Sequence, residues 1–172
     1  TISVRFSGDD GSTGNQNQTL GGTLALTPTT GGVSFGSTIN TVSGNTHNAL
    51  LIDSQNTSGT NTLTSGIFLD SDLKIQQAAG GTLSTSTGSF DVKARKLTVD
   101  SAGSVTIGQA LTSSLGAGGS LVKQGAGTLT LSSTSNTYTG TSSGTLNANG
   151  TQIAAGTLAI AGDTSLGLAP AG

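Results

Sequence analysis

The feature that most constrains the fold is a series of very short segments in which polar and apolar residues alternate before a turn residue interrupts them. In "TLTL" (128–131), Leu129 and Leu131 fall on one face of an extended strand and the two threonines on the other. Such a short strand cannot bury its leucines alone. Similar segments lie at 2–6, 50–53, 66–70, 72–75, 96–99, 104–107 and 157–160.

The interior that these strands enclose must be narrow. Thr, Ser and Gly supply 82 of the 172 residues, and the aromatic residues are only four Phe and one Tyr. In a parallel β-solenoid, turns of roughly 20–25 residues stack about 4.8 Å apart around a column of small aliphatic side chains. The sequence therefore predicts an all-β fold, a parallel β-helix (β-solenoid) that forms one right-handed rod of about seven or eight rungs. A mixed β-sandwich in the first half is the alternative.

The organisation along the chain follows from the same pattern. Gly-Thr-Leu recurs at 22–24, 81–83, 127–129, 144–146 and 156–158, so its spacing is irregular. Two segments, 7–19 and 53–62, contain few apolar residues, and we expect both to be loops that leave the rod. We expect residues 1–172 to form a single solenoid segment, cut from a longer exported protein, because the chain has neither an initiating Met nor a signal peptide.

Composition argues against several kinds of function. The chain has no cysteine, so it has no disulfide framework and no thiol nucleophile. Its formal net charge is −2 and its one basic cluster is Lys93, Arg95 and Lys96, which we interpret as a solvated face rather than a nucleic-acid surface. No apolar run approaches the roughly 20 residues that a membrane-spanning helix needs.

Two longer motifs carry a family resemblance. The stretches "GGSLVKQGAGTLTLSSTSNTYTG" (118–140) and "AGTLAIAGDTSLG" (155–167) resemble the autotransporter-associated β-strand repeat, also called the passenger-associated transport repeat. We take 118–167 as the recognisable repeat. The matching positions are Leu121, Lys123, Gly125, Gly127, Thr128, Leu129, Leu131, Asn136, Tyr138, Gly140, Ala155, Gly156, Thr157 and Leu158.

These motif residues are expected to be structural. Leu129, Leu131, Leu158 and Ile160 should point inward. Gly125, Gly127 and Gly156 should lie at bends, and Tyr138 should pack over a rung at a corner. The chain departs from the family pattern between Tyr138 and Leu158, where "TSSGTLNANGTQI" lengthens the connection, so 141–155 is either a protruding loop or an extra strand.

The resemblance implies a non-enzymatic segment of a bacterial autotransporter passenger, exported across the outer membrane to the cell surface. Such a segment supports export and extends or presents adhesive regions. The implied partners are the parent's outer-membrane translocator and surface glycans or proteins of a host or neighbouring cell. Exposed strand edges at the ends of the rod would also favour end-to-end self-association. The alternative is a direct adhesin that binds a glycan or matrix protein through polar faces or loops.

Residues with catalytic chemistry are sparse. A polysaccharide-active enzyme on a β-helix is a lesser alternative, and its candidate carboxylates are Asp53, Asp70, Asp72, Asp91 and Asp100. We interpret "LDSDLK" (69–74) as a turn between two apolar segments instead. His47 has no partner at a recognisable spacing and is expected to lie in an exposed turn.

Ligand chemistry is equally limited. We expect no cofactor, with calcium as the inorganic alternative, because the loop "GDDGSTGN" (8–15) gathers oxygen donors. Its donors would be Asp9, Asp10, Thr13 and Asn15. Pairs of threonines could order water against ice, but only if they are in register over many turns. The irregular spacing of the repeats argues against that register.

Overall fold

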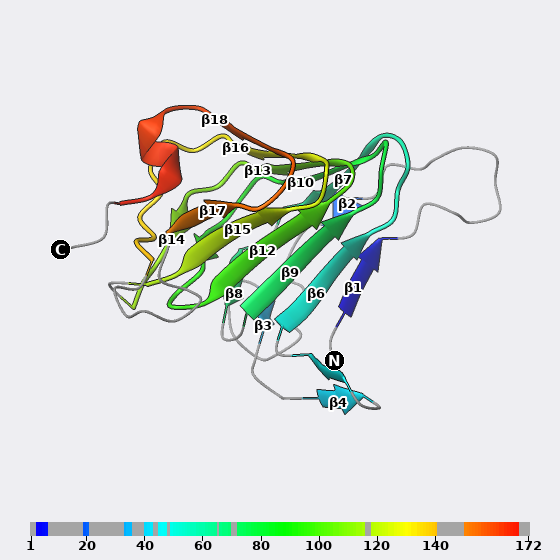
Figure 1. The fold of residues 1–172 in the computed structure, drawn as a ribbon, viewed down its shortest axis with the longest axis horizontal. Helices are drawn as coiled ribbons and strands as arrows, with labels where there is room; N and C mark the ends of the chain where they lie inside the picture. The colour runs from blue at the N-terminus through cyan, green and yellow to red at the C-terminus, as the bar shows by residue number, and fades with distance from the viewer. Residues whose placement is uncertain are drawn as a thin grey trace.

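The computed structural model describes residues 3–6, 19–20, 33–35, 40–42, 45–47, 49–64, 66–69, 72–115, 118–140 and 150–168. Within these residues the chain coils into a parallel β-solenoid (Figure 1). One face is sheet A, which has six strands in the order β1-β6-β9-β12-β15-β17. These strands are Ser3–Phe6, Ala49–Ser54, Asp72–Gln77, Lys96–Ser101, Ser120–Gln124 and Thr151–Ile153.

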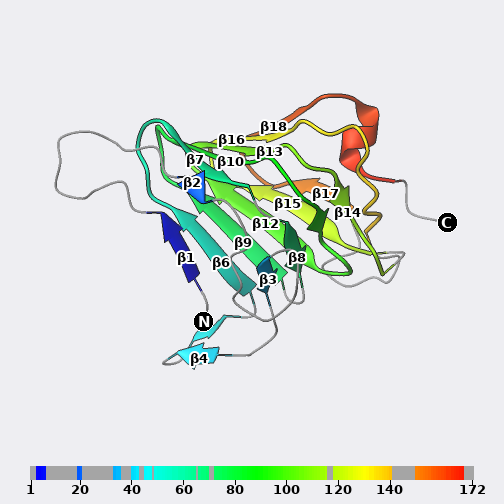
Figure 2. The same cartoon turned by 180° about the vertical axis from the view of Figure 1, so that it is seen from behind.

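Two further faces complete the coil. Sheet B has the order β18-β16-β13-β10-β7-β2, and sheet C the order β14-β11-β8-β3. The strands of sheet B are β2 (Thr19–Leu20), β7 (Thr60–Leu63), β10 (Thr82–Thr85), β13 (Ser104–Ile107), β16 (Thr128–Leu131) and β18 (Thr157–Ile160). Those of sheet C are β3 (Val33–Phe35), β8 (Ile67–Leu69), β11 (Phe90–Asp91) and β14 (Leu111–Thr112). Seen from behind, β3 and β8 lie in front of the strands of sheet A (Figure 2).

The turn length is nearly constant in the middle of the chain. On sheet A, Leu73 pairs with Leu97 and Leu97 with Leu121, so two successive turns are equally long. On sheet C, Phe90 pairs with Leu111, which makes that step slightly shorter. These steps fall within the predicted turn of roughly 20–25 residues. Three consecutive turns, β6–β8, β9–β11 and β12–β14, each contribute one strand to every face.

The core is a set of ladders formed by identical positions of successive turns. On sheet A, Leu73, Leu97 and Leu121 follow one another in register, and none is more than 1% exposed. Leu83, Val105 and Leu129 form the equivalent ladder on sheet B. Parallel in-register pairing stacks like side chains, so branched aliphatic residues fill the interior without large aromatic rings. The predicted all-β, parallel solenoid is confirmed.

The interpretation of 53–62 as a loop leaving the rod is wrong. Asp53 and Ser54 belong to β6 and β7 begins at Thr60. Asn56, in the corner between these strands, and Asn61, in β7, are both completely buried. The amide of Asn61 donates to Ser54 Oγ at 3.0 Å and to Asn56 Oδ1 at 3.1 Å. Because these polar side chains satisfy one another, a polar segment can turn inside the solenoid instead of outside it.

The first half does not form a separate sandwich within the described strands. β1, β2 and β3 pair in parallel with β6, β7 and β8, and so extend the three faces. One antiparallel pair, β4 (Asn40–Val42) with β5 (Asn45–His47), lies beside the solenoid. The predicted loop 7–19 lies outside the described residues except for Thr19. Right-handedness and seven or eight rungs stay predictions.

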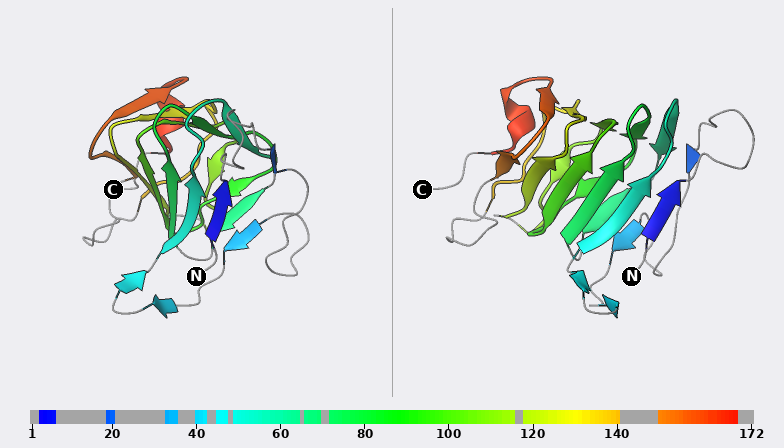
Figure 3. Two further views of the ribbon diagram at one scale, coloured as in Figure 1. Left: turned by 90° about the vertical axis from the view of Figure 1, so that its right-hand side faces the viewer. Right: turned by 45° about the vertical axis from the view of Figure 1, so that its right-hand side comes forward.

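The two ends of the described stack differ. β1 lies at one end, and β17, β18 and the short 3-10 helix η1 (Asp163–Leu166) lie at the other (Figures 1 and 3). The last turn on sheet A is longer than the three before it, since Leu121 pairs with Thr151. Within the segment 141–155, whose form the sequence left open, Thr151–Ile153 is the strand β17, whereas 141–149 lies outside the described residues.

Candidate functional site

The motif residues gather on the last two turns of the solenoid. Leu121 and Lys123 lie on β15, Thr128 to Leu131 make up β16, and Thr157 to Ile160 make up β18. Asn136 and Tyr138 lie in the segment that follows β16. This segment lies beside β14 of sheet C, because the backbone N–H of Thr137 donates to the oxygen of Leu111. We call residues 120–168 the terminal turn region. Its chemistry decides whether the motif builds a binding site or holds the turns together.

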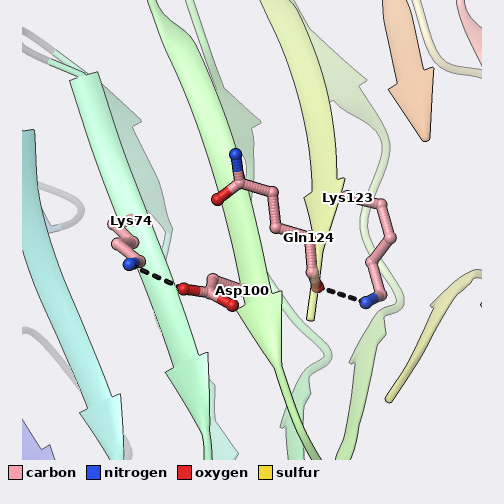
Figure 4. Close-up of polar contacts among 4 residues, drawn as sticks. All are labelled: Lys74, Asp100, Lys123 and Gln124. Atoms are coloured by element: carbon pink, nitrogen blue, oxygen red, sulfur yellow. Dashed lines mark hydrogen bonds and ion pairs between the residues drawn. The ribbon is translucent and has the colours of Figure 1, made fainter. Parts of the chain in front are cut away.

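Lys123 occupies a position that its neighbours in the ladder fill with aliphatic residues. It pairs with Val99 on one side and with Ile153 on the other, and its side chain is 0% exposed. Its Nζ donates to the carbonyl oxygen of Gln124 (Figure 4) and, at 2.8 Å, to the carbonyl oxygen of Gly125. Burial lowers the pKa of Lys123, and the charge of Asp100 partly opposes this. The lysine therefore caps the backbone of the corner after β15.

Two glycines allow the corner to stack closely. A Cβ on Gly127 would lie 2.0 Å from the carbonyl oxygen of Gly103, one turn below. Gly156 has a φ of 74°, and a Cβ there would lie 2.3 Å from the oxygen of Gly125 and 2.8 Å from Lys123 Nζ. Only glycine fits both positions, because no side chain can approach the backbone of the adjacent turn so closely.

Asn136 connects three turns through its side-chain amide. Its Oδ1 accepts a hydrogen bond from the backbone N–H of Leu111 at 2.9 Å, and its Nδ2 donates to the carbonyl oxygen of Ser165 at 2.6 Å. The side chain is 2% exposed. A buried amide with both ends paired to backbone acts as a bridge along the rod.

Tyr138 is buried against the same region. It is 1% exposed, and its hydroxyl lies 2.7 Å from Thr151 Oγ1 on β17. Burial raises the pKa of Tyr138, and the hydrogen bond with Thr151 partly opposes this. The backbone N–H of Gly140, which has a φ of 71°, donates to the oxygen of Gly119 at 2.8 Å. The tyrosine therefore connects the segment after β16 to the strand of the next turn.

The apolar motif residues lie on the inner face, and their burial decreases toward the end of the stack. Leu121, Leu129 and Leu131 are at most 1% exposed. Leu158 is partly buried against the core, whereas Ile160, in register with Leu131, is 40% exposed. Thr128 and Thr157 alternate with the leucines on the outer face.

The candidate carboxylates serve turn structure and ion pairs. Asp91 Oδ1 accepts from the backbone N–H of Lys93 at 2.9 Å, and Asp72 Oδ1 accepts from that of Lys96 at 2.9 Å. Asp100 pairs with Lys74 at 2.7 Å (Figure 4), and the hydrogen bond from this lysine lowers the pKa of Asp100.

Other predicted ligand residues gather at no site in the described structure. Asp53 is 5% exposed on β6, and Asp70 lies outside the described residues. His47, expected in a turn, lies in β5. Asp9, Asp10, Thr13 and Asn15 also lie outside the described residues. Among the residues that the structure does describe, no three His, Cys, Asp or Glu side chains are grouped to hold a metal.

Sequence reasoning missed the buried polar corner residues. Gln77 Nε2 donates to the oxygens of Asn56 and Ala78 at 2.9 and 3.0 Å, and Thr85 Oγ1 donates to Gln109 Oε1 at 2.6 Å. A signal was available, because these residues directly end or follow alternating segments. A polar residue at the end of an inward-facing series marks a corner that needs its carbonyl groups satisfied.

The fold and the terminal turn define the class of protein: a parallel β-solenoid whose last turn is held by buried side chains that bond to backbone. The family model described as Passenger-associated-transport-repeat matches residues 121–160. No curated protein and no solved structure gave a significant match. The matched family is a structural passenger repeat, which implies a secreted or surface-exposed protein. In the described residues, no helix is long and apolar enough to cross a membrane.

Proposed function

We propose that this chain is a structural segment of a bacterial autotransporter passenger, which supports export by folding outside the cell and extends or presents adhesive regions. The observation that carries the proposal is that the polar side chains of the motif are buried and hydrogen-bonded within the protein. Lys123, Asn136 and Tyr138 are each at most 2% exposed and bond to neighbouring backbone or side chains. These groups hold successive turns together and are turned away from any ligand in solvent.

The stacking of successive turns would supply free energy for export without the hydrolysis of a nucleotide. Each new strand pairs with a strand that is already in place, as β12 does on β9 and β15 on β12. In a repeat architecture every added turn contributes a similar interface, so folding can proceed from one end to the other. The hydrogen bonds of Lys123, Asn136 and Tyr138 would make the terminal turn region resist unfolding. A folded terminal turn region outside the cell would then prevent the chain from moving back through the pore of the translocator.

A display experiment tests this role. The chain is inserted between the signal peptide and the translocator of an autotransporter, and the amount exposed on intact cells is measured by added protease. The double variant Leu129→Asp and Leu131→Asp places charges in the core, and we expect surface exposure to fall several-fold. The matched control, Thr128→Asp and Thr130→Asp, changes the outer face of the same strand and should be displayed like the wild type. Equal display of both variants would contradict the proposal.

The shape of the rod and its binding partners are a further part of the proposed function. We propose that the rod is right-handed, that it has seven or eight rungs in all, and that it carries adhesive loops toward surface glycans or proteins. Ile153 is 55% exposed on the last strand of sheet A and Ile160 40% on that of sheet B, which supports end-to-end association.

The direct adhesin alternative is tested separately. Purified chain is screened against glycans and matrix proteins, with calcium and with a chelator. Saturable binding that requires residues 7–19 or 141–155 would make the chain itself an adhesin. A folded chain that binds nothing on the panel would favour the spacer and export role.

A further inference from the structure

We propose that the outer face of sheet B binds ice. The face consists of the first and third residues of β7, β10, β13 and β16, all of which are Thr or Ser. We call this surface the hydroxyl face. This inference goes beyond the structural role proposed above and does not depend on it.

The hydroxyl face is a regular two-dimensional array. Ser104 pairs in register with Thr82 on one side and with Thr128 on the other. The third residues of the same strands, centred on Thr106, pair in the same way, and the array continues onto β7 without a change of register. The irregular Gly-Thr-Leu spacing argued against such an arrangement. That expectation is wrong, because these four strands begin at nearly equal intervals along the chain.

The side chains of the array are presented outward. In each of the four strands the hydroxyl residues alternate with buried residues, and they are themselves half-buried or, at Ser104, exposed. The strands lie side by side along one edge of the molecule in Figure 1. Core ladders on the inner face, such as Leu83, Val105 and Leu129, keep the array in register.

Charge separates this face from its neighbour. The strands of sheet B, as the structure describes them, contain no charged residue. On sheet A, by contrast, the outward positions of β9 and β12 include Asp72, Lys74, Lys96 and Asp100. Charged side chains orient water around themselves and hold it strongly, which is incompatible with a neutral hydrogen-bonded lattice. A hydroxyl can instead donate and accept within such a lattice, and the threonine methyl group fills space between water molecules.

The dimensions of the array are close to those of ice. Neighbouring strands are about 4.8 Å apart, and alternate residues along a strand are about 6.7 Å apart. With tetrahedral hydrogen bonds of about 2.75 Å, water oxygens that share a neighbour lie about 4.5 Å apart, and the layers repeat after about 7.3 Å. The mismatch is about 0.3 Å between neighbouring strands and about 0.6 Å between alternate residues of a strand, small enough for side-chain rotation to absorb over four strands.

The same observations argue against a soluble organic ligand. Sites for such ligands are concave and are lined mostly by apolar and aromatic side chains, with a few polar groups. The outward positions of β7, β10, β13 and β16 carry neither an aromatic ring nor a carboxylate. A repeating array of one neutral group fits a repeating, neutral partner.

Ice partitioning tests the inference with the whole 172-residue chain. Ice is grown slowly from a dilute protein solution, and the protein in the ice is compared with the protein left in the liquid. Thr106→Tyr places a bulky ring at the centre of the hydroxyl face. Thr98→Tyr is the matched control, because Thr98 is a half-buried outward residue at the centre of sheet A. Tyrosine suits a strand, so both variants should fold, and circular dichroism checks this.

We expect the wild type and Thr98→Tyr to be enriched in the ice, and Thr106→Tyr to be enriched about tenfold less, because its ring holds the surface away from the lattice. Exclusion of the folded wild type from ice would overturn the inference. Equal enrichment of all three proteins would do the same. Binding to insoluble polysaccharide that Thr106→Tyr abolishes, without enrichment in ice, would replace ice by a glycan as the partner.

Discussion

At the scale of single residues, the central feature is a lysine within an aliphatic ladder. Val99 and Ile153 occupy the adjoining positions, yet Lys123 is fully buried and donates to two corner carbonyl groups. Burying an ammonium group is costly unless it is hydrogen-bonded. The corner after β15 therefore depends on Lys123, because its Nζ and the oxygen of Gly125 to which it donates both lie close against Gly156 of the next turn.

Replacement of this lysine should destabilise the fold. We expect Lys123→Met, which keeps the length of the side chain, to lower the free energy of unfolding by about 1–3 kcal/mol, because two carbonyl groups of the corner lose the charged donor that they share. Lys74→Met is the control, since Lys74 is 35% exposed in an ion pair, and its cost should stay below about 1 kcal/mol. Urea unfolding measures both. A Lys123→Met protein as stable as the wild type would show that the corner needs no donor.

The ion pair of Asp100 with Lys74 predicts a dependence on pH. The hydrogen bond from Lys74 lowers the pKa of Asp100 in the folded chain, so the carboxylate stabilises the fold above its unfolded pKa of about 3.9. That stability is lost as the pH falls through the folded pKa. We expect the free energy of unfolding of the wild type to exceed that of Asp100→Asn by about 0.2–1 kcal/mol at pH 7, and by less at pH 3. Urea unfolding at the two pH values measures this difference. A difference that does not change with pH would argue against the pair.

At the scale of elements, the strands could be predicted and the corners could not. Alternation such as that of Thr128 to Leu131 reveals a strand directly, because inward and outward positions have different chemistry. The corner at Asn56 looked like a loop because its residues are polar. Its burial depends on hydrogen bonds to Asn56 from Asn61, five residues away, and from Gln77, 21 residues away on the next turn. The second of these follows from the stacking of turns and is recorded by no local pattern.

For the candidate site, the sequence identified the motif residues but not the groups to which they bond. The motif singled out Lys123, Asn136 and Tyr138 by resemblance. Their partners, among them the N–H of Leu111 and the hydroxyl of Thr151, follow only from the stacking of turns. The register of the outer threonines was also hidden, because β7 and β13 lack the Gly-Thr-Leu motif that marks β10 and β16, and the motif alone is therefore irregularly spaced.

Close stacking at corners gives a prediction at this scale. In Gly127→Ala the new Cβ would lie 2.0 Å from the oxygen of Gly103, and we expect a loss of about 2–3 kcal/mol, since backbone must move. Gly162→Ala is the control, because its nearest neighbour is Thr134 Cγ2 at 3.4 Å and its φ of −179° suits any residue. We expect it to change stability by less than about 0.5 kcal/mol. Thermal unfolding compares the two, and equal stability would refute close stacking at Gly127.

At the scale of the whole molecule, one nearly constant period organises the turns from β6 to β16. The same nearly constant step along the chain that stacks the leucines inside also aligns the threonines outside. One repeat thus builds a core, a charged face on sheet A and a neutral hydroxyl face on sheet B. The exposed isoleucines of β17 and β18 show that the described stack ends without a cover.

The most direct test of the parallel solenoid is to measure whether residues one full turn apart along the chain lie close together in space. The chain has no cysteine, so pairs of cysteines can carry pyrene labels without interference. Ser84 and Thr106 are adjacent in register although a full turn of chain separates them, whereas Ser84 and Thr98 are closer in sequence and lie on different faces. We predict excimer fluorescence from the labelled pair Ser84→Cys and Thr106→Cys, and none from Ser84→Cys and Thr98→Cys. Excimer fluorescence from the second pair alone would contradict the parallel solenoid.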